Sequence, residues 1–186
     1  MVEVDGIEDD VRALLFRLGE DPQRDGLRET PARVARAWRE LTEGYAQDPQ
    51  VILDATFDVG PYDQMVVVRD IEFWSLCEHH LLPFHGMACV GYLPSKRVVG
   101  LSKIGRLVQC FARRLQVQER MTQQVAEAMH STLEPLGVGV IVRATHTCMA
   151  MRGVRLGGEM VTSALLGRFR EDAILRAEFL TLANVR

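Results

Sequence analysis

Two thiols and one imidazole in this chain have the types and spacing of a metal site. Cys77 and His80 are separated by two residues in the run Cys77-Glu78-His79-His80, and Cys148 lies far downstream in His146-Thr147-Cys148. Zn²⁺ is a borderline-soft ion that prefers sulfur and nitrogen ligands, so this donor set suits zinc. Structural zinc sites usually have four protein ligands, whereas catalytic sites leave one position open. Three ligands with further histidines beside them therefore indicate a catalytic zinc ion.

The alternative is that each of these side chains is simply buried. Against it, four of the five histidines of the chain lie close in sequence to Cys77 or Cys148. Water in an open zinc position loses a proton near neutral pH, and such chemistry needs a group that moves protons. The unperturbed pKa of a histidine side chain lies near neutrality, so His79 and His146 are the candidates, with Glu78 as the other possibility.

A carboxylate and several basic residues suggest a nucleotide substrate. The carboxylate of Glu119 could accept two hydrogen bonds from paired N–H donors such as those of guanine, although a charged turn between helices would look the same. A triphosphate would need several cations, because arginine grips phosphate with two hydrogen bonds and lysine acts as a point charge. The candidates are Lys103, Arg106, Arg113 and Arg152. No glycine-rich Walker loop is present, so this is not a P-loop site.

Composition is that of an ordinary globular protein. The chain has 186 residues, 47% of them hydrophobic and 25% charged, with a net charge of −3. This size fits one domain with a small helical appendage, and the mild acidity gives no reason to expect a nucleic-acid partner. The acidic beginning lacks the basic part of a secretory signal, and no apolar run approaches the roughly 20 residues that span a bilayer. We therefore expect a cytoplasmic protein without a membrane partner, whose four cysteines bind metal or are buried rather than form disulfides.

The elements that must position these residues follow from periodicity and end signals. A helical section is expected over residues 1–50, with helices over 7–18 and from Thr30, the expected N-cap. From about residue 51 the pattern becomes β, and the catalytic section is expected over 51–186. Strands are predicted over 65–77, 84–94, 138–148 and 160–168, and helices from Ser102 (as N-cap), over 118–133 and over 170–183. Alternation would place His146 and Cys148 on one face of the strand 138–148. This order indicates an α+β fold with a mostly antiparallel sheet.

Several motifs in register carry a resemblance to a known family. They are Arg28-Glu29-Thr30-Pro31-Ala32-Arg33-Val34, Cys77-Glu78-His79-His80-Leu81-Leu82-Pro83-Phe84, Gly91-Tyr92-Leu93-Pro94, Gly100-Leu101-Ser102-Lys103, Arg113 to Arg120, His146 to Gly153, and Val161-Thr162-Ser163-Ala164. In order and spacing the chain resembles GTP cyclohydrolase I across about residues 7–182.

The resemblance implies a fold, a reaction and a set of roles. The fold would be the tunnelling fold, a four-stranded antiparallel sheet with two antiparallel helices on one face, assembled as a homodecamer with active sites between subunits. The reaction would open the imidazole ring of GTP, release formate and yield 7,8-dihydroneopterin triphosphate, the first step toward folate and other pterins. The implied zinc ligands are Cys77, His80 and Cys148, and the implied proton-transfer residues are His79 and His146. Substrate binding would fall to Glu119 as guanine anchor and to Gln118, Ser102, Lys103, Arg106 and Arg152.

Three other functions would use similar residues. A zinc nucleoside deaminase would carry a Pro-Cys-x-x-Cys run, which this chain lacks. A non-catalytic relative would have lost ligands or Glu119, and a nitrile-reducing relative of queuosine synthesis would not need the Cys-Glu-His-His run. One departure from the family pattern is visible: Cys89 stands where histidine is common, and we expect this to add a thiol near the site.

Overall fold

One sheet with helices on both of its faces forms the body of the molecule. The computed structural model describes residues 6–58, 60 and 62–183. Four long strands pair antiparallel in the order β2-β3-β6-β7, and short β5 pairs parallel with β2 at the edge. Their bounds are β2 Val66–Cys77, β3 Pro83–Leu93, β5 Leu115–Gln116, β6 Gly137–His146 and β7 Glu159–Gly167. The predicted strands are therefore confirmed to within about two residues, and two further short strands, β1 Thr56–Asp58 and β4 Arg97–Val99, form a separate antiparallel pair.

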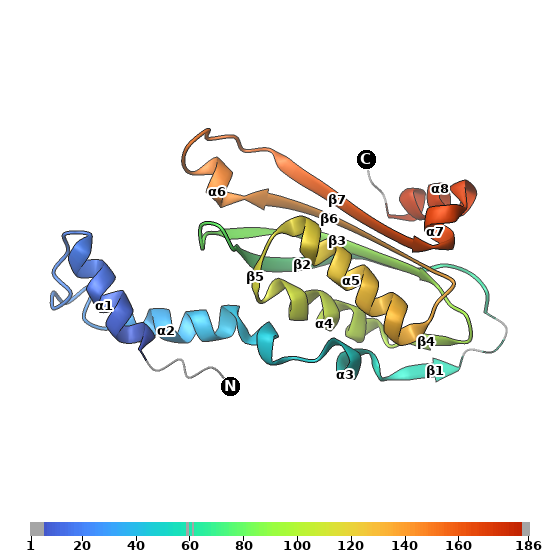
Figure 1. Cartoon of the computed structure of the whole chain (residues 1–186), viewed down its shortest axis with the longest axis horizontal. Helices are drawn as coiled ribbons and strands as arrows, with labels where there is room; N and C mark the ends of the chain where they lie inside the picture. The colour runs from blue at the N-terminus through green and yellow to red at the C-terminus, as the bar shows by residue number, and fades with distance from the viewer. Residues whose placement is uncertain (1–5, 59, 61, 184–186) are drawn as a thin grey trace.

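Helices α4 (Leu101–Ala112) and α5 (Gln118–Leu133) cover one face of this sheet (Figure 1). They run in opposite directions, because only the short β5 segment separates the end of α4 from the start of α5. Alternate residues of β6 point into the core beneath them, as the period of two requires, and Val138, Val140 and Val142 have no exposed surface. This arrangement is the tunnelling fold that the family resemblance implied.

The opposite face of the sheet carries the end of the chain. The single helix predicted over 170–183 is in fact two, α7 (Arg168–Glu171) and α8 (Ala173–Leu182), because Asp172 is extended and caps α8 with its side chain. Phe179 of α8 enters a slot over Gly91 and Gly139, where an added Cβ would lie 2.6 Å from its ring. Cys89 packs in this second cluster rather than beside the metal ligands, so the expectation of a thiol near the site is wrong.

The N-terminal section contains α1 (Ile7–Arg17), α2 (Thr30–Leu41), a short 3₁₀ helix η1 (Glu43–Ala46) and α3 (Pro49–Leu53). Helices α1 and α2 project from the body as an arm (Figure 1), whereas η1 and α3 pack against α4. Helix α1 packs on α2, yet none of its residues is buried. Helix α3 spans residue 50, so the β structure begins only at Thr56, and the division into two sections stays a prediction.

Two predicted N-caps are displaced by a residue or two. Thr30 is the first residue of α2 and follows the N-cap Glu29, while Ser102 lies in the first turn of α4 behind the N-cap Gly100. No side chain caps the first turn of either helix, so the hydroxyl groups of Thr30 and Ser102 do not mark where the helices begin. No helix in the described part of the chain is long and apolar enough to cross a membrane.

Candidate functional site

The first two candidate ligands lie in a tight turn at the end of β2. The carbonyl oxygen of Cys77 accepts hydrogen bonds from the N–H groups of His80 (3.3 Å) and Leu81 (2.8 Å), and the Cys77 N–H donates to the carbonyl of Leu82 (2.9 Å). Leu81 closes the turn with a φ of 56°, a conformation that bulky side chains rarely adopt. The turn places Nδ1 of His80 3.7 Å from Sγ of Cys77.

The third candidate ligand is not on a strand, contrary to the prediction for residues 138–148. Strand β6 ends at His146, paired with Phe84, and Cys148 lies in the helical turn α6 (Thr147–Ala150). The next residue along β3 is Pro83, which has no N–H to continue the ladder. The Thr147 hydroxyl donates to the Pro83 carbonyl instead. The turn brings the Cys148 thiol back toward Cys77, which an extended strand would not do.

These donors fit a zinc ion. The ligand atoms of Cys77, His80 and Cys148 all lie within 4.8 Å of one another. With zinc bonds of about 2.3 Å to sulfur and 2.05 Å to nitrogen, tetrahedral geometry requires a sulfur–nitrogen separation of about 3.6 Å. The 3.7 Å between Cys77 and His80 is close to that value. Burial raises the pKa of the Cys148 thiol, and the adjacent Cys77 raises it further, so two thiolates here need a cation to stabilise them.

His146 is held beside this cluster by a buried amide. Its Nε2 lies 2.8 Å from Oε1 of Gln118, the first residue of α5. Its ring stacks on Phe84 with the planes 4° apart and the centroids 4.6 Å apart. Burial lowers the pKa of His146, and the charge of Glu119 partly opposes this effect. The imidazole is thus favoured in its neutral form and has a fixed orientation, which suits a group that moves protons.

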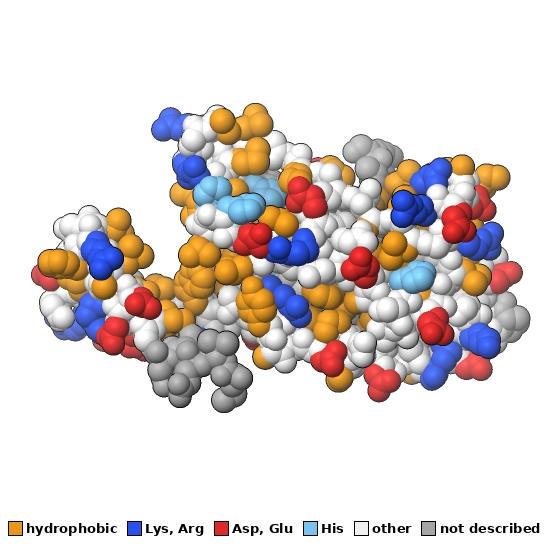
Figure 2. Space-filling model, in the orientation of Figure 1, with side chains coloured by type: hydrophobic (Ala, Val, Ile, Leu, Met, Phe, Trp, Pro, Cys, Tyr) orange, Lys and Arg blue, Asp and Glu red, His pale blue; other side chains and the backbone are white. Residues whose placement is uncertain are grey.

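His79 is the exposed member of the group. Its Nδ1 lies 4.0 Å from Sγ of Cys77, and its Nε2 lies 3.9 Å from a carboxylate oxygen of Glu78. At this end of the molecule, near α6, histidine side chains gather on the surface with acidic and basic groups close by (Figure 2). The structure therefore places His79 at the rim of the Cys77, His80 and Cys148 group, where solvent or a ligand can reach it.

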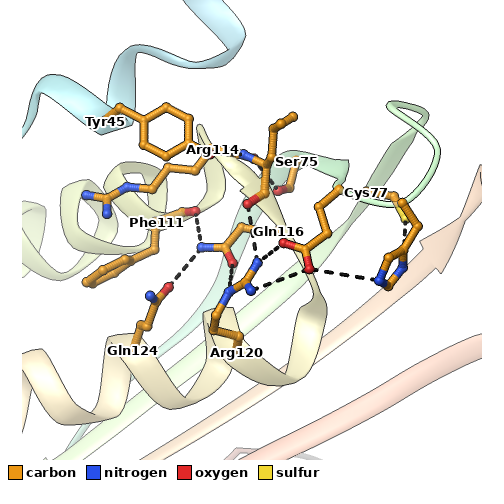
Figure 3. A network of polar contacts seen from close by, with 11 residues as sticks. Tyr45, Ser75, Cys77, Phe111, Arg114, Gln116, Arg120 and Gln124 are labelled. Carbon is orange, nitrogen blue, oxygen red and sulfur yellow. Dashed lines mark hydrogen bonds and ion pairs between the residues drawn. The ribbon is translucent and has the colours of Figure 1, made fainter. Parts of the chain in front are cut away.

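An ion pair connects the turn that contains Cys77 and His80 to the start of α5. Glu78 pairs with Arg120, which lowers the pKa of the Glu78 carboxyl, chiefly through their hydrogen bond. Arg120 also donates to Oε1 of Gln116 at 3.2 Å (Figure 3). The buried Gln116 amide in turn donates to the carbonyl of Phe111 and to Gln124. Sequence reasoning gave Arg120 no role, because its partner lies 42 residues away and no local pattern marks it.

Glu119 and Arg152 both lie near this centre and are exposed. Glu119 follows Gln118 in the first turn of α5, and its charge acts on His146. Arg152 lies just beyond α6, and its charge acts on Cys148. Gln118 differs from both, because it is 1% exposed and its amide is used inside the protein.

Ser102, Lys103 and Arg106 are not brought to the site in one chain. They lie in the first two turns of α4, and Leu101, its first residue, lines an apolar groove with Val66 and Tyr92. Cys77 is at the other end of β2, eleven positions after Val66, and at about 3.3 Å per residue the two ends of this strand are roughly 35 Å apart. Figure 1 shows α4 running from the β4 end of the molecule toward β5. Within one chain, these three residues therefore lie apart from the Cys77, His80 and Cys148 group.

Comparison with known proteins identifies the family. The family model for GTP cyclohydrolase I matches residues 7–184. A protein of Nitrosospira multiformis named GTP cyclohydrolase 1 is 57% identical over 94% of this chain and 93% of its own length. Proteins of the same name from a Synechococcus strain and from Gloeobacter violaceus are 56% and 52% identical, over 92% and 97% of this chain and 76% and 85% of their own lengths.

Among solved structures, the archaeosine synthase QueF-Like in the apo form aligns with a TM-score of 0.45 and 16% identity, over 55% of this chain and 95% of its own. The family assignment rests on the sequence matches, which include the turn with Cys77 and His80, the start of α5 and the α6 turn. This chain belongs to the GTP cyclohydrolase I family.

Proposed function

We propose that this chain hydrolyses the imidazole ring of GTP at C8, releases that carbon as formate and forms 7,8-dihydroneopterin triphosphate, the first step toward folate and other pterins. The observation that carries the proposal is the convergence of two thiols and an imidazole beside His146, in a member of this family. The relatives at 52–57% identity, all named for this activity, support it.

Cys77, His80 and Cys148 would hold Zn²⁺. Their sulfur and nitrogen donors and their spacing support zinc over the oxygen-preferring ions. When bound, zinc supplies Lewis-acid activation of a water molecule near neutral pH.

The remaining side chains bind and move protons. Glu119 would accept hydrogen bonds from N1–H and the 2-amino group of guanine, and its exposure in the first turn of α5 supports that role. His146 would deliver a proton to N7 as the ring opens, and its fixed, partly buried ring supports it as the internal proton donor. His79, at the rim, would exchange protons with solvent during the later steps.

The triphosphate would be held across a subunit boundary. Arg152 comes from the subunit that carries the metal cluster, and Ser102, Lys103 and Arg106 would come from a neighbour in a homodecamer. The apolar groove next to Ser102 supports this, because Phe57 and Leu101 at its edge are 57% and 66% exposed. The arm supports it as well, since Phe16 and Leu18 are 73% and 70% exposed and would be covered by another subunit. The enzyme would act in the cytoplasm.

The activity is tested by incubating purified protein with GTP and measuring formate and pterin absorbance together. We expect equal amounts of both products. GTP binding without either product would overturn the proposal in favour of a non-catalytic relative, and ammonia release would favour a deaminase.

The shared site is tested by complementation between subunits. Lys103→Ala and Cys148→Ser should each be inactive alone. Co-expressed in one oligomer, they should regain part of the activity, because some sites then combine an intact metal cluster with an intact Lys103. A mixed oligomer that stays inactive would contradict the shared site, and Cys148→Ser with Arg152→Ala, both from the same side of the site, is the matched control that should not complement.

A further inference from the structure

We propose that Gln118 is a positioning residue that acts through His146, fixing which ring nitrogen of the histidine carries the permanent proton, and that its side chain does not bind the nucleotide. The role of His146 as proton donor rests on the proposed function. The assignment of the proton on the ring rests on hydrogen bonds alone.

Every polar atom of the Gln118 side chain is already bonded inside the protein. Oε1 faces His146 at 2.8 Å. Nε2 lies 3.0 Å from the carbonyl oxygens of Val142 in β6 and Met160 in β7, and 3.1 Å from the hydroxyl of Thr162. The residue is 1% exposed, so a substrate could reach the amide only by breaking these contacts.

The two backbone carbonyls decide which way the amide points. A carbonyl oxygen can only accept a hydrogen bond, so the group facing Val142 and Met160 must be the NH₂ of Gln118. The atom facing His146 is then the amide oxygen, which also can only accept. His146 must therefore donate from Nε2, and its neutral form is the Nε2–H tautomer.

The hydrogen bonds of two threonine hydroxyls require the same orientation of the Gln118 amide. The Thr122 hydroxyl lies 2.7 Å from the backbone carbonyl of Gln118 and must donate to it. Its oxygen then accepts from the hydroxyl of Thr162, also at 2.7 Å. The Thr162 oxygen is left to accept from the Gln118 NH₂. The NH₂ group of Gln118 therefore faces three acceptors, although it has only two N–H groups to donate. These acceptors fix one orientation of the amide.

The consequence concerns the other ring nitrogen. Among the described residues, none forms a hydrogen bond with Nδ1 of His146. In the doubly protonated ring, the Nε2–H stays on His146 and donates to Gln118, so the proton that Nδ1 has taken from water is the one transferred to the substrate. Without Gln118 the ring could turn or take the opposite tautomer, and the transferable proton would be on the wrong side. Loss of tautomer control in a hydrogen-bonded catalytic histidine can cost up to about 10⁴-fold in rate.

The tautomer is read directly by solid-state NMR of the zinc-loaded, substrate-free protein labelled with ¹⁵N- and ¹³C-histidine. The His146 signals are those lost in His146→Asn. We expect a protonated Nε2 and an unprotonated Nδ1 in the wild type at pH 8, and a mixture or a reversal in Gln118→Met. An unprotonated Nε2 in the wild type would overturn the proposal. The wild-type measurement needs no active enzyme, and His146→Asn serves only to identify its signals, so the proton assignment can be refuted even if the proposed function fails.

Kinetics separate positioning from substrate binding. Gln118→Met should lower kcat about 10²-fold or more with KM for GTP nearly unchanged, and it should add almost nothing in a His146→Asn background, because both substitutions remove the same function. Gln123→Met, the same substitution on the exposed side of α5, is the matched control, and we expect kcat within about threefold of the wild type. A raised KM with additive losses in the double variant would contradict the proposal and make Gln118 a substrate-binding residue.

Discussion

Replacing Phe179 with alanine should release α8 from the sheet and expose Cys89. The Phe179 ring has no exposed surface, lies in the slot over Gly91 and Gly139, and stacks on Phe169 with the centroids 5.3 Å apart. It is the main residue through which α8 (Ala173–Leu182) contacts the cluster that contains Cys89. Alanine would leave this slot empty, because the two glycines have no side chains with which to fill it.

The magnitude follows from the size of the lost group. Truncating a fully buried phenylalanine to alanine costs about 3–5 kcal/mol. If that cost falls on the local opening of α8, the open population rises by about two to three orders of magnitude, at about 1.4 kcal/mol for each factor of ten. Cys89 reports this opening, because it is 7% exposed and burial raises its pKa to about 11, which makes it unreactive in the closed state.

The assay is alkylation of the native zinc-loaded protein with a maleimide, followed by mass spectrometry of the peptides. Cys89 should react about 10²- to 10³-fold faster in Phe179→Ala than in the wild type. Cys110 is an internal reference, because it is fully buried in contact with the N-terminal section, on the other side of the molecule. Leu180→Ala, on the same helix but 40% exposed, is the matched control and should change little. An increase below tenfold, or equal acceleration of Cys110, would refute local release of α8.

Two further outcomes can be checked on the same protein. Gly86→Ala should prevent folding, because a Cβ there would lie 1.8 Å from the backbone oxygen of Arg143. Its control is Gly105→Ala in α4, where a Cβ meets no atom within 4 Å, and urea titrations should show the free energy of unfolding raised by about 0.5–1 kcal/mol. A soluble, stable Gly86→Ala protein would contradict the β3–β6 packing. Backbone N–H groups at the start of α8 lower the pKa of Asp172, so the stability that this cap contributes is present above the ordinary aspartate pKa and is lost as the pH falls through the lowered value, below about pH 4. Below that pH, the hydrogen-exchange rate of α8 amides should rise in the wild type but not in Asp172→Asn. The same pH dependence in both proteins would contradict a stabilising role for the Asp172 cap.

Much of the fold could be predicted because its patterns are local. The alternation Val138, Val140, Val142 identified β6, and the Cys77-to-His80 run identified a ligand turn at a strand end. The three ligands could be named from donor chemistry alone, and the structure brings their atoms together.

What could not be predicted depends on contacts between distant residues. The strand prediction ran through Cys148 because alternation continues there, and only the pairing of β6 with β3 reveals that Pro83 ends the ladder. The bonds of Gln118 reach residues 24 to 44 positions away, so no sequence window indicates that its amide serves His146. The separation of Lys103, near the start of α4, from Cys77, at the end of β2, likewise appears only when β2 and α4 are laid side by side.

The central claim is that Cys77, His80 and Cys148 hold a zinc ion on which the opening of GTP depends. The most direct measurement is zinc content together with formate released from GTP, for the wild type before and after chelation, and for Cys148→Ser beside the non-ligand control Cys89→Ser. We expect about one zinc ion per subunit and formate release in the wild type and in Cys89→Ser, with loss of both on chelation, recovery on adding Zn²⁺, and loss of both in Cys148→Ser. Undiminished formate release from the chelated wild type or from Cys148→Ser would contradict the claim.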